Sequence, residues 1–170
     1  MATPGLLEYT PLPAVSRHNL HNIWGNDLAD HINLVKLSVG TESIDTMLAW
    51  QRMRASQVKD GQYYHVTRMW PKREAELLDG GSIYWVIKGV IQCRQRITAL
   101  REVIGQDDIR RCGIVLAPEI IRTASTPKKA FQGWRYLSPA DAPPDLTDSQ
   151  QAEDSLPPEL QKALAALGVR

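Results

Sequence analysis

The sequence has no long apolar run and no recognisable leader. Its strongest apolar stretch, Ile83 to Ile91, is interrupted by Lys88 and Gly89, and it is far shorter than the roughly 18 consecutive apolar residues that a membrane span needs. Residues 1–30 carry three acidic side chains against one arginine, and they lack the basic start and apolar core of a secretory signal. We therefore expect a cytoplasmic protein that does not associate with membranes.

Cysteine is also scarce. The 170 residues include two, Cys93 and Cys112, with neither a CxxC pair nor a Cys/His pair at ligand spacing, and this excludes a disulfide scaffold. Both fall inside predicted strands, so we interpret them as reduced thiols of the core. His65 has no cysteine or acidic partner at ligand spacing, and we expect no metal site.

The motifs of several enzyme classes are missing. The chain contains no GxSxG, HExxH, GxxxxGKS/T or GxGxxG pattern, so hydrolase, zinc-protease, P-loop and dinucleotide-binding interpretations have no specific support. The acidic residues cluster in turns or beside basic residues on a helix, which does not suit a catalytic carboxylate pair. We expect no catalytic residue and no cofactor, and the sequence alone indicates no reaction.

The net charge of +1 hides an uneven distribution. Residues 31–138 hold 17 basic and 10 acidic side chains, a net of +7, whereas residues 1–30 have a net of −2 and residues 139–170 a net of −4. A basic body with an acidic tail is typical of proteins that bind polyanions. The alternative is a solvated surface of mixed charge followed by a disordered tail.

Hydrophobic periodicity and turn residues predict one domain over 31–144, between an irregular extension at 1–30 and an acidic linker with a short helix at 145–170. The predicted strands are 32–39, 63–68, 82–97, 100–104, 110–116 and 131–137, and the predicted helices are 43–57, 72–78, one turn at 118–123, and 159–167 after a linker at 139–155. This composition favours an α+β fold, namely a small, partly closed mixed or antiparallel β-barrel with two or three peripheral helices.

The strand at 82–97 is the clearest of these. Alternation places Ile83, Trp85, Ile87, Ile91 and Cys93 on one face. Gly89 interrupts the pattern, and we interpret it as a bulge or sharp bend of the kind that closes small barrels.

Aromatic and basic residues lie side by side in three clusters. These are Tyr63, Tyr64, His65, Arg68, Trp70, Lys72 and Arg73; Tyr84, Trp85 and Lys88; and Lys128, Lys129, Phe131, Trp134, Arg135 and Tyr136. Rings that stack on bases, interleaved with cations that meet phosphates, are what single-stranded or extruded nucleotides require. The alternative is that Trp85 and Trp134 belong to the core and that the arginines simply alternate outward.

From these clusters we predict a nucleic-acid or anion-binding site. Its residues are Arg68, Trp70, Lys72, Arg73, Lys88, Arg94, Arg96, Trp134 and Arg135. Arg68, Lys72 and Arg73 are expected to form one anion-binding surface, because a strand end and a first helical turn bring bases near free N–H groups. Trp70 is the predicted stacking ring and Trp134 its partly buried support.

Three long motifs carry a family resemblance. They are HVTRMWPKR (65–73), ELLDGGSIYWVIKGVIQCRQRI (76–97) and FQGWRYL (131–137), joined by NLVKLSVG near the start and IRRCGIVLAPEIIRT further on. With these motifs the chain resembles, over 32–144, an alphaproteobacterial family catalogued as domain of unknown function 1489, whereas residues 1–30 depart from it. A weaker likeness links the chain to PUA-like barrels, through the basic Pro-Lys-Arg turn, the glycine turn before a long strand and the aromatic last strand. That likeness implies a nucleotide-binding cleft beside the loop that carries Trp70.

Three functions therefore stay open. The leading hypothesis is a non-enzymatic module that binds nucleic acid or nucleotides, RNA rather than DNA, through a basic and aromatic cleft. The second is an enzyme acting on a phosphorylated or nucleotide-like small molecule, with Arg68, Lys72 and Arg73 as anion clamps. The third is a protein-assembly factor that uses the helix at 159–167. An enzyme predicts a concave pocket with perturbed titratable groups, and a binding module predicts an open charged face.

Overall fold

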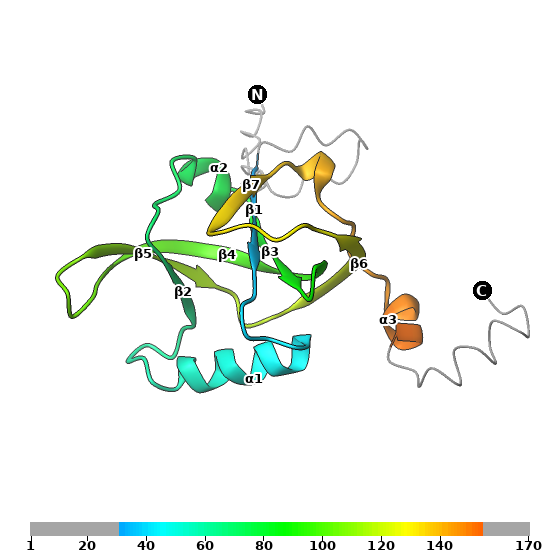
Figure 1. Ribbon diagram of the computed structural model, residues 1–170, viewed down its shortest axis with the longest axis horizontal. Helices are drawn as coiled ribbons and strands as arrows, with labels where there is room; N and C mark the ends of the chain where they lie inside the picture. Colours follow the sequence, from blue (N-terminus) through cyan, green and yellow to red (C-terminus); the bar gives the residue numbers. More distant parts are fainter. Residues whose placement is uncertain (1–30, 155–170) are drawn as a thin grey trace, which may run out of the picture.

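The computed structural model of the protein describes residues 31–154 (Figure 1). Their elements follow in the order β1 (Asn33–Leu37), α1 (Ile44–Ala55), β2 (Tyr64–Thr67), α2 (Glu74–Leu78), β3 (Ser82–Ile87), β4 (Val90–Ile104), β5 (Arg110–Leu116), β6 (Ile121–Pro127), β7 (Trp134–Leu137), the 3-10 helix η2 (Pro139–Asp141) and α3 (Asp148–Asp154). The predicted extension at 1–30 and helix at 159–167 lie outside the described residues.

The seven strands form one mixed sheet in the order β2-β5-β4-β3-β1-β7, and β6 pairs with β4 off this path. β1 runs parallel to β3, and the other pairs are antiparallel. The expected α+β class is confirmed. No described pairing joins β2 to β7, so the sheet is open and not a closed barrel.

β4 is the centre of this sheet. Its first half pairs with β3 on one side and β6 on the other, and its second half pairs with β5. The register shifts between Trp85 and Val86 against β3, between Ile91 and Cys93 against β6, and between Ile97 and Ala99 against β5. Such irregularities increase local twist and bend a strand. The two halves of β4 therefore belong to two parts of the sheet that differ in orientation.

The prediction of one long strand through Gly89 is wrong. Lys88 and Gly89 have positive φ angles of 49° and 78°, the pattern of a two-residue hairpin loop, and they join β3 to β4. Because Val86 pairs with Ile91 across this turn, Ile91 lies on the face opposite to Ile87. The alternation of apolar residues in the sequence predicts both on one face.

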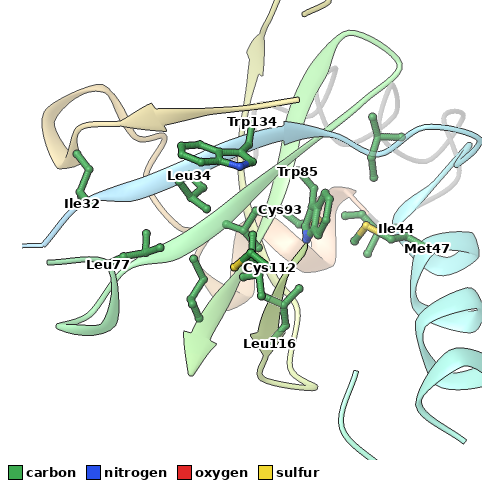
Figure 2. Packing of buried hydrophobic residues seen from close by; sticks show 14 residues of the cluster. Ile32, Leu34, Ile44, Met47, Leu77, Trp85, Cys93, Cys112, Leu116 and Trp134 are labelled. Carbon is green, nitrogen blue, oxygen red and sulfur yellow. The ribbon is translucent and has the colours of Figure 1, made fainter. Parts of the chain in front are cut away.

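The main core lies on one face of the sheet (Figure 2). It contains Ile32, Leu34, Ile44, Met47, Leu77, Ile83, Trp85, Ile87, Cys93, Ile97, Cys112, Ile114, Leu116 and Trp134. A smaller cluster on the other face contains Val35, Tyr84, Val86, Ile91 and Leu137. Both cysteines are free and buried, as their position inside strands predicted.

α1 crosses the end of the sheet to which β1 leads (Figure 1). A capping box between Ser43 and Thr46 fixes its start. It buries only Ile44, Met47 and Gln51, so most of this short helix borders solvent or hollows beside the sheet.

Two other predicted segments differ from the structure. Residues 118–123 form no helical turn, since β6 begins at Ile121 and pairs with β4. The predicted linker at 139–155 contains η2 and α3, and its Pro144 carbonyl accepts from the Ala124 amide at 2.9 Å. Asp145 also pairs with Arg94 at 2.6 Å. Both errors arise because distant partners, not local composition, order these residues.

Candidate functional site

The loop between β2 and α2 carries four of the predicted site residues. Arg68 and Lys72 are exposed. Arg73 donates from Nε to Glu76 Oε1 at 2.8 Å, and its backbone N–H donates to Tyr136 Oη at 3.0 Å. Glu76 therefore occupies the guanidinium that was expected to complete an anion-binding surface.

Both tryptophans of the predicted site donate hydrogen bonds to other residues of the protein. Trp70 is half-buried, donates from Nε1 to Glu74 Oε2 at 3.2 Å, and has the Arg110 guanidinium 5.3 Å from its ring centroid. Trp134 is 5% exposed and donates to the Met69 carbonyl at 3.3 Å. Trp134 is thus a core residue, and one neighbouring cation already lies over Trp70.

The remaining predicted bases are spread along the sheet. Arg94 is engaged by Asp145 and also donates to Ser82 Oγ at 3.0 Å. Arg96 is exposed on β4, and Arg135 lies over the Phe131 ring at 5.7 Å. Lys88 stands at the far end of β3 from α2. The nine predicted residues therefore do not converge on one cleft.

A cavity that the sequence analysis did not predict lies where β1 ends. Its volume is about 410 Å³, it is open to solvent on one side, and it is bordered by β1 and the loop after it, by α1, and by residues of β2 and β3. The lining residues are Lys36, Leu37, Ser38, Val39, Gly40, Thr41, Thr46, Met47, Trp50, Gln51, Tyr63, His65 and Trp85. We call this space the aromatic cavity.

Four rings form its walls in two edge-on pairs. The Trp50 and Tyr63 centroids are 5.9 Å apart at 75°, and those of His65 and Trp85 are 5.5 Å apart at 80°. Burial raises the pKa of Tyr63 to about 12, so its hydroxyl stays protonated at neutral pH. The cavity thus offers flat apolar surfaces with few charges.

A buried amide pair holds one wall in place. Gln95 Oε1 accepts from Trp85 Nε1 at 2.8 Å and from Gln51 Nε2 at 2.9 Å, and Gln95 Nε2 donates to Gln51 Oε1 at 2.9 Å. Gln95 is fully buried. Because buried polar groups are costly to leave unpaired, this network fixes the orientation of Trp85 and ties α1 to the sheet.

His65 and Lys36 are basic residues that line the cavity, and burial lowers the pKa of each. Burial, together with the positive charge of Lys36, lowers the pKa of His65 to about 4. Burial also lowers the pKa of Lys36, whose Nζ donates to the Gly133 carbonyl at 3.4 Å. No described group hydrogen-bonds to the His65 ring, so a neutral imidazole presents one donor and one acceptor to a ligand.

Lysines gather at the same end of the sheet as the cavity. β1 and β3 are parallel and both end there, β7 begins there, and the Lys128 amide donates to the Gly89 carbonyl at 2.8 Å. We call Lys36, which lines the cavity, together with Lys88, Lys128 and Lys129 at the same end of the sheet, the basic rim. None of them has an ion pair within the described part of the chain.

Two further observations concern metal ligands and membrane-spanning helices. Within residues 31–154 no group of three or more His, Cys, Asp or Glu side chains is placed to hold a metal ion. None of the described helices is both long and apolar enough to cross a membrane.

Sequence reasoning missed Lys36, Trp50 and Gln51. Trp50 is 44% exposed, and a large ring at an exposed helix position is the kind of local signal that could have identified it. Lys36 lies between Val35 and Leu37 in a short strand whose first three residues are buried, which is a similar signal. Tyr63 and His65 were placed in an aromatic and basic cluster but not in the predicted site.

The fold and cavity define an α+β domain with one open mixed sheet and an aromatic-walled pocket. The chain belongs to the family described as "Protein of unknown function (DUF1489)", which matches residues 34–170. Comparison with curated proteins gave no match, and comparison with solved structures gave none either.

Proposed function

We propose that the protein is a nucleic-acid or nucleotide-binding module of the cytoplasm that accepts a single base in the aromatic cavity. The observation that carries this proposal is the combination of four rings around one space with a basic rim at the same end of the sheet. Stacking on aromatic rings is tolerant of base identity and is worth about 1–3 kcal/mol per base. The cavity volume of about 410 Å³ falls within the roughly 300–1,000 Å³ typical of small-molecule sites.

The basic rim supplies the second half of this binding mode. A base that enters the cavity leaves its sugar and phosphate at the mouth, where lysines neutralise the phosphate charge. Lys88, Lys128 and Lys129 have no acidic partner among the described residues. They are therefore better phosphate ligands than Arg73 or Arg94, which carboxylates already engage.

We further propose that RNA is preferred over DNA. The Ser38 and Thr41 hydroxyls line the cavity and hydrogen-bond to each other at 2.5 Å. Hydroxyls at the mouth are suited to the 2′-OH, the group that lets a protein distinguish RNA from DNA. We also propose that the domain is distantly related to PUA-like barrels and that the protein is of alphaproteobacterial origin.

The test is titration of a five-nucleotide single-stranded RNA, and of the DNA of the same sequence, measured by fluorescence anisotropy. We expect RNA to bind more tightly than DNA. Replacing Trp50 by Ala should weaken RNA binding roughly 5- to 100-fold, because a stacked ring is lost. Met53→Ala, at an equally exposed site on the same helix, is the matched control. Absence of RNA binding, or equal loss in both variants, would refute the proposal.

An enzyme acting on a nucleotide-like small molecule is the second candidate. It is favoured by the lowered pKa values of Lys36 and His65 within one concave pocket, since perturbed titratable groups concentrate in active sites. A binding module and an enzyme differ in whether the nucleotide is converted into product. Nucleotides incubated with the protein and analysed by chromatography should remain unchanged if the protein only binds, and product that disappears with Lys36→Gln would establish catalysis.

A further inference from the structure

A second cavity adjoins the aromatic cavity. Its volume is about 350 Å³, and it is formed by the last turn of α1, the connection that follows, and the exposed side of β2. Its lining residues are Trp50, Arg54, Gln57, Val58, Gln62, Tyr63, Tyr64, His65 and Val66. Trp50, Tyr63 and His65 line both cavities, so the two spaces share one aromatic wall.

The shared wall can serve a ligand on each side. Trp50 is 44% exposed and makes an edge-to-face contact with Tyr63 at a centroid distance of 5.9 Å, and the Arg54 guanidinium lies over its ring, so part of its ring surface is open. Tyr64 gives the second cavity another ring, and the Arg101 guanidinium lies 3.6 Å from its centroid. A salt bridge to Asp60 at 2.7 Å holds Arg101 in that position.

A cation without an acidic partner among the described residues lies over this wall. The Arg54 guanidinium lies 4.9 Å from the Trp50 ring centroid, and no acidic side chain in the described residues pairs with it. An arginine so placed is available for a phosphate. The other polar groups of the second cavity, Gln57 and Gln62, are neutral amides that suit the edges of bases.

We infer that the second cavity binds the neighbouring base of the same strand, so that the ligand is a dinucleotide step divided by Trp50, with Arg54 contacting the phosphate that links the two nucleotides. This inference rests on the proposed function. It specifies the smallest complete ligand and assigns a role to residues that a single-base site does not use.

The experiment compares 5′-AMP with the dinucleotide pApA by isothermal titration calorimetry. We expect pApA to bind at least tenfold more tightly than AMP. Arg54→Gln should remove most of that difference. The affinity for AMP should stay within about twofold of the unaltered protein's, because AMP occupies only the aromatic cavity. Arg52→Gln is the matched control, since Arg52 is on the same helix but lines a different cavity, of about 510 Å³.

A second variant tests occupancy without removing charge. Gln57→Trp places a bulky ring in the second cavity from a position outside α1. It should weaken pApA binding to the level of AMP. Equal affinities for AMP and pApA in the unaltered protein would overturn the dinucleotide inference while leaving the proposed function intact. Failure of both ligands to bind would overturn both.

Discussion

His65 is a residue whose charge the fold controls directly. Its pKa is lowered to about 4, from an ordinary 6.5, by burial and by Lys36. The unfolded chain therefore binds more protons than the folded chain between these two values, so stability rises with pH across that window and is flat above it.

This shift predicts the pH dependence of stability. When the pH is lowered from 7 to 4.5, the free energy of unfolding should fall in both proteins. The fall should be larger in the unaltered protein than in His65→Phe by on the order of 2 kcal/mol, because the variant has no imidazole to protonate. Urea denaturation of both proteins at the two pH values measures this difference. The carboxylates are common to both proteins and cancel. Parallel pH profiles for the two would show that His65 is not held neutral.

The tryptophans give a second prediction at this scale. The hypothesis that Trp70 stacks on a ligand stays a prediction, and Trp50 is the alternative stacking ring. We expect Trp50→Ala to weaken RNA binding and cost little stability, because the ring is 44% exposed. We expect Trp70→Ala to destabilise the fold through lost contacts with Glu74 and Arg110 and to leave the affinity of the folded protein unchanged.

Anisotropy titrations and thermal melts of both variants decide between these residues. Trp134→Ala is the reference for a buried ring and should cost about 3–5 kcal/mol, since Trp134 is 5% exposed. If Trp70→Ala abolishes binding without lowering the melting temperature, the loop between β2 and α2 is the binding surface.

At the scale of elements, the turn between β3 and β4 makes a specific demand. Lys88 has a φ of 49°, a left-handed conformation that costs a residue with a Cβ about 1–2 kcal/mol and that Asn tolerates better. Lys88→Asn should therefore raise the free energy of unfolding by about 0.5–1 kcal/mol while it weakens RNA binding by removing a basic-rim charge.

Chemical denaturation and RNA titration of the same variant measure both effects. Lys129→Asn is the matched control, because it removes a charge of the same rim at a position without positive φ, and its stability should stay within about 0.5 kcal/mol. A Lys88→Asn protein less stable than its parent would contradict the turn assignment.

The elements also show how far local sequence reaches. The helix at 43–57, the strand at 63–68 and the hairpin from 100 to 116 were predicted because capping, β-branched residues and turn residues act within a few positions. β6 and the docked Asp145 were missed because their partners, Cys93 and Arg94 among them, are far away in sequence.

The candidate site was out of reach for the same reason. Lys36, Trp50, His65 and Trp85 come from four different elements, and their convergence depends on how α1 crosses the sheet. The sequence did indicate the kind of chemistry, aromatic rings beside cations, since that is a property of composition. It did not indicate which rings face a common space.

At the scale of the whole molecule, residues 144–146, which follow β7, are bonded to β6 and β4. Removing residues 147–170 should shift the melting temperature by a few degrees or less, because the last described backbone contact to β6 is that of Leu146 with the Arg122 carbonyl. Removing 139–170 should lower it much further, since it deletes buried Pro143 and the Arg94 partner Asp145. Calorimetry of both truncations tests this, and equal melting temperatures would show that 139–146 does not stabilise the fold.

The pairing of β1 with β7 has a consequence for how the chain is made. β3 pairs with β4 and β4 with β5, the next strand along the chain in each case, whereas Asn33 pairs with the distant Leu137 of β7. Among the described strands β1 is synthesised first and β7 last, and unpaired strand edges invite association with other chains. The β1 edge is therefore exposed until β7 has been made, and the four residues of β7 then form the edge of the sheet in its place.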